Sequence, residues 1–136
     1  KDINLNRMNF LRKFTNNVGY SDHALSSDKN LIAMKLAIFY GAKIIEKHFT
    51  ILDKTKTRDG LISMTPKQLN EISSFVSLSK EEQKKYFSSI SKNLIKNILG
   101  KNNRTLTDIE LLNRDYYRGR FGSLVKSRKN IIHKKT

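Results

Sequence analysis

The chain has 136 residues, which is enough for one ordinary domain. It contains no cysteine, so disulfides and thiolate metal sites are excluded. No apolar run approaches the roughly twenty residues that a helix needs to cross a bilayer. The first residues do not resemble a secretory signal, so we expect a soluble, cytoplasmic protein that does not bind membranes.

The charge of the chain is strongly positive, with a formal net value of +15 and a pI of about 10.1. Such a charge is typical of proteins that bind nucleic acid. Here the excess is mostly lysine spread along the chain beside abundant Asn and Ile, a mixture typical of AT-rich coding sequences. We therefore do not expect nucleic acid as a partner. The basic cluster 126–135 is either a solvated terminus or an electrostatic patch for nucleic acid or membrane.

The first predicted element is a helix near the start of the chain. Met8, Leu11 and Phe14 recur there at helical spacing, and either Asn4 or Asn6 is the candidate N-cap. Leu5 and Phe10 flank this apolar face, and we expect the helix to end near residues 16–17.

A strand, a helix and a second strand are predicted next. The apolar run 18–21 predicts a short strand, and residues 26–28 offer caps for a nearly all-apolar helix that ends at Gly41 as a C′ residue. The run 44–49 predicts the second strand. A strand–helix–strand unit with a short crossover requires parallel strands and a right-handed connection.

Two further helices have clear start signals. Thr65, Pro66 and Gln68 form a capping box with Pro at the first helical position. Its predicted buried stripe is Leu69, Ile72, Phe75 and Val76. Residues 79–82 repeat the capping signal for one helix that ends at Gly100, with an apolar face of Tyr86, Phe87, Ile90, Leu94, Ile95 and Ile98.

The pattern weakens beyond residue 100. Residues 106–113 form either a helical turn or an extended linker, and 121–132 predicts one strand. Two parallel strands do not make a stable sheet alone, because parallel sheets are covered on both faces and normally contain more strands. The predicted fold class is therefore α/β, and we expect the chain to be the last portion of a larger α/β domain.

Each predicted strand ends in a histidine near a carboxylate. Asp22 and His23 follow the first strand, and Glu46 and His48 close the second. In an α/β barrel, the working residues lie at the carboxyl ends of the strands. Alternation places Glu46 and His48 on one strand face with Ile44, and a buried unpaired carboxylate costs several kcal/mol. A metal, a cationic ligand or a lysine partner would explain Glu46 there.

The two histidines predict a divalent metal site. Neutral imidazole suits Mn²⁺, Fe²⁺, Co²⁺ or Zn²⁺, and oxygen donors shift the preference toward Mn²⁺ and Mg²⁺. Taken singly, His23 is better explained as a hydrogen-bonded loop residue and His48 as a satisfied core residue. Taken together at matched strand ends, they are explained equally well by an open Lewis-acid site. Asp22 and Glu46 are candidates to hold the imidazoles in their tautomers. Ser21 is either part of this site or a turn residue.

The polar loop 53–60 follows the second strand. It is either an ordinary surface loop or a lid over the strand ends. Asp59 is a candidate acceptor for a sugar hydroxyl or a candidate base. The sequence has no Walker loop, dinucleotide fingerprint or nucleophile elbow.

Residues 18–23 and 41–50 resemble the N-acetylneuraminate (sialic acid) synthase family. Asp59, Ser63, Met64 and Pro66 also fall where that family carries an Asp, a Ser and the Pro of the next helix. The resemblance is strong over residues 1–78 and weaker beyond them.

The resemblance implies the C-terminal portion of a (β/α)₈ TIM barrel, namely its last two strands and their helices. Residues 1–100 would be this partial barrel, 101–122 a linker, and 123–136 the incomplete start of an antifreeze-like (SAF) domain. The match to the SAF domain is imperfect at Lys126, Asn130 and Lys134.

The family condenses phosphoenolpyruvate with N-acetylmannosamine or a related amino sugar to a nine-carbon 2-keto sugar acid and phosphate. The resemblance implies that His23 and His48 bind a divalent metal, typically Mn²⁺, with Mg²⁺ or Co²⁺ as alternatives. Ser21 would contact phosphoenolpyruvate. Asp59 and His48 would lie near the sugar, and Glu46 would lie at the barrel mouth; these three are the implied catalytic residues.

The family also uses groups from earlier strands and, in a homodimer, an Arg from the SAF domain of the partner subunit. Because catalysis depends on assembling several groups at once, we expect this chain to be a fragment without full activity alone. A legionaminic or pseudaminic acid synthase is the alternative within the class. Two alternatives lie outside this class. One is a non-catalytic basic module that binds nucleic acid in a salt-sensitive way. The other is a non-catalytic remnant that pairs with another chain supplying the rest of the barrel.

Overall fold

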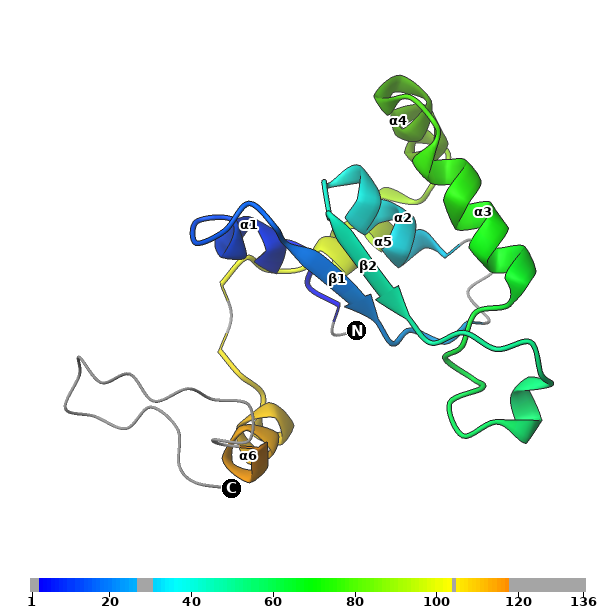
Figure 1. Cartoon of the computed structure of the whole chain (residues 1–136). Coiled ribbons are helices and arrows are strands. Elements are labelled where there is room, and N and C mark those ends of the chain that lie inside the picture. Colours follow the sequence, from blue (N-terminus) through cyan, green and yellow to red (C-terminus); the bar gives the residue numbers. More distant parts are fainter. Residues whose placement is uncertain (1–2, 27–30, 104, 118–136) are drawn as a thin grey trace. The chain divides into compact units, whose positions relative to one another are not determined.

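The computed structural model describes residues 3–26, 31–103 and 105–117, and the chain divides into two units, Lys1–Asn103 and Arg104–Thr136. Figure 1 shows the elements of the first unit: α1 (Arg7–Leu11), β1 (Gly19–Asp22), α2 (Ile32–Phe39), β2 (Ile44–Lys47), the 3₁₀ turn η1 (Lys54–Lys56), α3 (Pro66–Val76), α4 (Lys80–Ser88) and α5 (Lys92–Leu99). The second unit contains α6 (Asp108–Tyr117). Within the described residues, every helix is too short or too polar to cross a bilayer.

The sheet consists of β1 and β2, which run parallel with α2 as the connection between them (Figure 1). Ser21 lies opposite Glu46, and Asp22 lies opposite Lys47. The predicted strand–helix–strand unit and the α/β class are therefore confirmed. Because the strands are parallel, their carboxyl ends lie at the same edge of the sheet.

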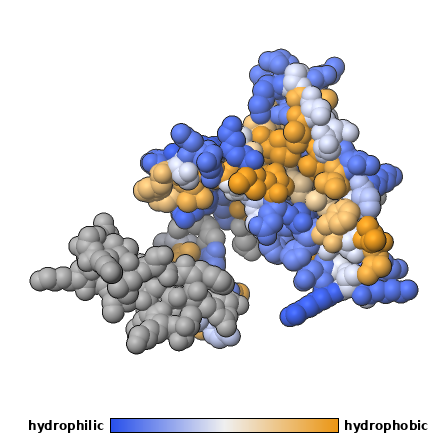
Figure 2. All heavy atoms as spheres, in the orientation of Figure 1, coloured by the Kyte–Doolittle hydropathy of each residue, from blue (hydrophilic) through white to orange (hydrophobic). Residues whose placement is uncertain are grey.

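The two faces of the sheet have different environments. Tyr20, Asp22, Ile45 and Lys47 lie on the packed face, where Tyr20 and Ile45 contact the core. The opposite face carries Gly19, Ser21, Ile44 and Glu46, all of them exposed. We call this second surface the open face. Figure 2 shows apolar residues gathered over the region of the strands and the adjoining helices.

The core lies between the packed face of the sheet and the helices. α2 is buried along most of its length, and α3 and α4 pack against it. The buried apolar residues of the core come from five helices and from the segments beside them: Leu5, Met8, Val18, Ile32, Ala33, Leu36, Ala37, Phe75, Phe87 and Ile98.

The end of α2 is a Schellman motif. Gly41 adopts a left-handed φ of 83°, its N–H donates to Ile38 O, and Ala42 N–H donates to Ala37 O. The predicted C′ role of Gly41 is confirmed. The predicted start of this helix is wrong, because its N-cap is Leu31 rather than a residue in 26–28.

The helix start signals of α3 and α4 are confirmed as two complete capping boxes, Thr65 with Gln68 and Ser79 with Glu82. The predicted stripe of α3 is only half right. Ile72 and Phe75 are buried, whereas Leu69 and Val76 are exposed. The side of α3 that packs on α2 is therefore narrower than the apolar pattern indicates.

The prediction of one helix from the capping signal at 79–82 to Gly100 is wrong, since the chain leaves the helix after Ser88 and starts α5 at Lys92. The hydroxyls of Ser88 and Ser89 donate to backbone carbonyls three residues earlier, at 2.7 Å and 2.9 Å. Serine hydroxyls compete in this way with helical hydrogen bonding, and α4 ends at these two serines. Gly100 closes α5 as predicted.

The N-terminal segment is fastened to the end of α5. Leu5 N–H donates to Ile98 O at 3.1 Å, and Asn6 Nδ2 donates to Gly100 O at 2.9 Å. Asn6 is the N-cap of α1, but its side chain makes this contact and no capping bond. Only Met8 of the predicted apolar face is buried; Leu11 and Phe14 are exposed, because α1 ends at Leu11.

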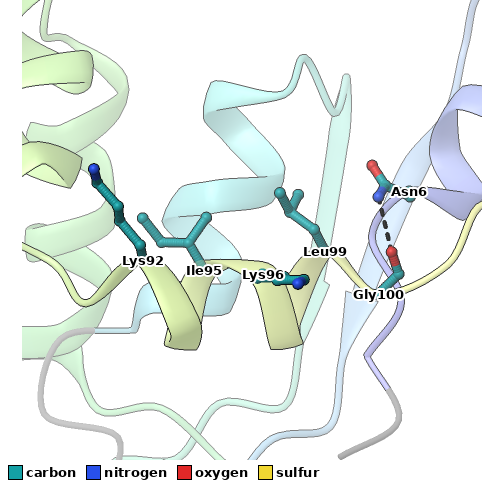
Figure 3. A pocket seen from close by; sticks show the side chains of 6 residues that line it. All are labelled: Asn6, Lys92, Ile95, Lys96, Leu99 and Gly100. Carbon is teal, nitrogen blue, oxygen red and sulfur yellow. Dashed lines mark hydrogen bonds between the residues drawn. The ribbon is translucent and has the colours of Figure 1, made fainter.

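A pocket of about 250 Å³ lies between α5 and this N-terminal segment (Figure 3). Its lining is Asn6, Lys92, Ile95, Lys96, Leu99 and Gly100, and it includes none of the predicted site residues.

The second unit contains a helix within the predicted linker. α6 begins after Thr107, whose hydroxyl accepts from Glu110 N–H while the Glu110 carboxylate accepts from Thr107 N–H. This reciprocal pair decides between the two predictions for 106–113 in favour of a helix. The predicted strand 121–132, the basic cluster 126–135 and the predicted SAF segment 123–136 lie outside the described residues.

Candidate functional site

The structure brings the two predicted histidines together. His23 directly follows β1 and His48 directly follows β2, so both lie where the parallel strands end. Their ring centroids are 5.2 Å apart and the rings are nearly perpendicular, at 77°. Continued alternation along each strand places them on the side of the open face. We call His23 and His48 the histidine pair.

Asp59 lies beside this pair. Its Oδ2 is 3.9 Å from His48 Nδ1, and the two side chains are 52% and 39% exposed. That distance is too long for a hydrogen bond. The Asp59 carboxylate therefore lies close to the His48 ring without a hydrogen bond to it.

The loop that carries Asp59 is anchored to the end of β2. Met64 N–H donates to His48 O at 2.8 Å, Thr50 N–H donates to Met64 O at 3.0 Å, and Phe49 and Met64 form an isolated parallel bridge. Gly60 is required for the path of the loop, since a Cβ there would lie 1.8 Å from Lys54 O. The loop therefore returns to the edge of the sheet beside the histidine pair.

Asp22 does not hold His23, contrary to the prediction. Its Oδ2 accepts from Lys47 Nζ at 2.7 Å, and its Oδ1 accepts from Tyr20 Oη at 3.0 Å and from Ala24 N–H at 3.1 Å. Asp22 is on the packed face, whereas His23 points the other way by alternation. Burial, together with the Asp22 carboxylate, raises the pKa of Tyr20.

Ser21 and Glu46 lie opposite each other on the open face, in register across the two strands. Both are exposed. The prediction that Glu46 is buried and needs a compensating cation is therefore wrong for this structure, because its side chain is exposed to solvent. Neither residue contacts the histidine pair through a hydrogen bond within the described residues.

Sequence reasoning missed the role of Lys47. Its ammonium is buried and bridges Asp22 Oδ2 and Ala24 O, the latter at 2.9 Å. Part of the signal was present, since alternation places Lys47 on the same strand face as the apolar Ile45. Its position opposite Asp22 follows from the strand register that the structure shows. A second missed lysine is Lys54 of the loop, whose ammonium donates to the hydroxyl of the buried Ser26.

The donor set fits a divalent cation in part. Two adjacent imidazoles are suitable nitrogen ligands for Mn²⁺ and its neighbours. Among the described residues, however, no cluster of three or more His, Cys, Asp or Glu side chains is placed to hold a metal. The histidine pair therefore fits two positions of an open site whose remaining positions would go to water or substrate.

The candidate site is therefore a pair of histidines at the carboxyl edge of a parallel sheet, in an α/β fold. The sequence model of the NeuB family matches residues 1–86. The chain belongs to the NeuB family, whose members are synthases.

Two curated relatives are similar over part of their length. The chain is 38% identical over 73 residues to the N,N′-diacetyllegionaminic acid synthase of Legionella pneumophila, which covers 53% of this chain and 19% of the relative. It is 34% identical over 105 residues to the spore coat polysaccharide biosynthesis protein SpsE of Bacillus subtilis, covering 76% and 26%. The chain thus spans about a fifth of the first relative and about a quarter of the second.

The fold is similar to the crystal structure of the same Bacillus subtilis protein. The TM-score is 0.57 at 27% sequence identity, and the match covers 87% of this chain and 32% of that one. The likeness therefore extends over most of the present chain.

Proposed function

We propose that this chain forms the last two strands and the following helices of a (β/α)₈ barrel in a sialic acid synthase-type enzyme. Family membership and the likeness to SpsE support this proposal. The open face supports it too, because the inner surface of a barrel is covered only when all strands are present. The observation that carries the proposal is the histidine pair, with centroids 5.2 Å apart at the carboxyl edge of the sheet.

The reaction we propose joins C3 of phosphoenolpyruvate to the aldehyde carbon of an N-acetylated amino sugar such as N-acetylmannosamine. One water is consumed, and the products are a nine-carbon 2-keto sugar acid and phosphate. His23 and His48 hold a divalent cation, Mn²⁺ or alternatively Mg²⁺ or Co²⁺. When bound, this cation supplies Lewis-acid polarisation of the sugar aldehyde.

The other site residues bind and orient the substrates in this proposal. Ser21, exposed on the open face, contacts phosphoenolpyruvate. Asp59, whose Oδ2 lies 3.9 Å from His48 Nδ1, accepts hydrogen bonds from the sugar. Glu46 lies at the mouth of the barrel beside Ser21. Segments outside this chain supply the remaining groups, including an Arg from the SAF domain of a partner subunit.

A second candidate substrate is the precursor of legionaminic acid. The relative from Legionella pneumophila is named as a synthase of the diacetyl form of that acid. Both candidates use the same carbon–carbon bond formation, so they differ in the sugar and not in the role of the histidine pair.

The first experiment measures Mn²⁺ binding to the chain by calorimetry. His23→Ala and His48→Ala should each abolish binding, because each removes one of two adjacent nitrogen ligands. The chain has three histidines, and His133→Ala is the matched control that should keep the wild-type affinity. Wild-type affinity in either of the first two variants would contradict the two-histidine site.

The second experiment tests the reaction in a chimera. Residues 1–78 of this chain replace the matching segment of the Legionella pneumophila synthase, and phosphate release from phosphoenolpyruvate is followed with Mn²⁺, with and without the sugar. We expect sugar-dependent release by the chimera, none by its His48→Ala variant, and none by the isolated chain. A folded chimera that binds Mn²⁺ but releases no phosphate would contradict the proposed function.

A further inference from the structure

One buried ammonium joins the ends of the two strands. Lys47 Nζ donates to Asp22 Oδ2 at 2.7 Å and to Ala24 O at 2.9 Å. The Lys47 and Asp22 side chains are 0% and 4% exposed. Asp22 Oδ1 completes the arrangement by accepting from Ala24 N–H and from Tyr20 Oη.

These contacts lie on both sides of His23. The residue before it, Asp22, and the residue after it, Ala24, both bind the Lys47 ammonium. Lys47 is also the residue before His48. A single side chain on the packed face therefore restrains the backbone that presents each imidazole on the opposite face, although no hydrogen bond joins it to either ring within the described residues.

We infer that Lys47 is a positioning residue for the histidine pair: it clamps the turn after β1 so that His23 stays beside His48. A buried ion pair is weak evidence for stability, because well-packed apolar residues of similar volume often stabilise as much. The ion pair does fix the positions of its groups. An unpaired buried charge is costly, so the Lys47 ammonium must stay aligned with its acceptors. The expected effect of Lys47 on metal affinity rests on the proposed function. Its expected effect on the placement of the imidazoles does not.

The test exploits the absence of cysteine from the chain. The Lys47→Cys variant is alkylated in denaturant with one of two reagents, and each product is then refolded. Bromoethylamine gives an aminoethyl thioether, which has the length and charge of lysine. Propyl iodide gives a thioether of the same length without the charge. Far-UV circular dichroism establishes that each form has refolded. A genetic counterpart, Asp22→Asn with Lys47→Met, removes both charges together, so that no unpaired buried carboxylate remains.

The first readout is the nuclear Overhauser effect between the ring protons of His23 and His48, observed without metal. Only three histidines contribute imidazole signals, which makes the assignment straightforward. We expect the cross-peak in the wild type and in the aminoethyl form, and its loss in the propyl form and in the double variant. Persistence of the cross-peak in the folded propyl form or the folded double variant would overturn the inference.

The second readout is Mn²⁺ affinity. Residues that orient metal ligands typically contribute about 10- to 100-fold, and we expect a loss of that size in the propyl form with recovery in the aminoethyl form. Lys35→Met is the matched control, because Lys35 is a second lysine with a side chain 5% exposed and an ion pair, to Glu71 at 2.6 Å, that joins α2 to α3. It should lower stability and leave Mn²⁺ affinity unchanged.

The two readouts separate the failure of each proposal. Absence of Mn²⁺ binding in the wild type, with the charge-dependent cross-peak present, would contradict the metal site and support the positioning role. Histidine-dependent Mn²⁺ binding that is equal in the propyl and aminoethyl forms would overturn the positioning role and leave the proposed function intact.

Discussion

At the scale of single residues, the site depends on which face of a strand each side chain occupies. His23 and His48 were identifiable because each follows an apolar run at a strand end. Their neighbours Asp22 and Lys47 point the opposite way and bind each other. A carboxylate next to a histidine in sequence is therefore not its partner in a strand, since adjacent residues face opposite sides.

Tyr20 makes the stability of the chain depend on alkaline pH. Its pKa in the folded state is raised above the usual 10.0, by burial first and then by Asp22. The unfolded chain thus releases this proton at lower pH than the folded chain does. The contribution to stability is present below about pH 10 and is lost as the pH rises above it.

The Tyr20→Phe variant tests this dependence. Urea unfolding at about pH 9 and about pH 11 should show a smaller fall in the free energy of unfolding for the variant than for the wild type. Between about pH 6 and about pH 8 the difference between the two proteins should stay constant. Parallel losses above pH 10 would show that Tyr20 is not the group responsible.

At the scale of elements, local capping signals were reliable and helix continuity was not. The capping boxes of α3 and α4 depend only on residues three apart, which the sequence displays directly. The break between α4 and α5 falls where two serine hydroxyls bind backbone carbonyls. An apolar pattern that continues through Ile90 conceals such a break.

Thr65→Ala removes the N-cap of α3. The Thr65 hydroxyl accepts from Gln68 N–H, and its loss should lower the free energy of unfolding by about 0.5–2 kcal/mol. Chemical denaturation measures the change. Ser74→Ala, at an exposed position within the same helix, is the control and should alter stability by no more than about 0.5 kcal/mol. Equal effects of the two substitutions would contradict a capping contribution.

At the scale of the whole molecule, the open face is the feature that needs explanation. Ile44, the first residue of β2, is 63% exposed on this face, which also carries the polar Ser21 and Glu46. Both strands also have an unpaired edge, because β1 and β2 form a two-stranded sheet within the described residues. Exposed apolar surface with open strand edges favours association with another chain.

Ile44→Ser tests whether the open face drives self-association. Sedimentation equilibrium of the wild type should show concentration-dependent oligomers, and the substitution should shift them toward monomer. Ile109→Ser is the matched control, because Ile109 of α6 is a 73% exposed isoleucine in the other unit. A monomeric wild type, or an equal shift in both variants, would contradict a role for the open face.

Local patterns in the sequence were sufficient for the α/β class, the parallel pairing of the strands, two capping boxes and the approach of the two histidines. Each of these depends on short-range spacing or on the rule that parallel strands end at one edge. Three features required the tertiary structure: the Asp22–Lys47 ion pair, the exposure of Glu46 and the separation of α4 from α5. The first two depend on strand register and on which face another element covers, and long-range packing decides both. The third falls where serine hydroxyls bind carbonyls three residues earlier, which an apolar pattern does not reveal.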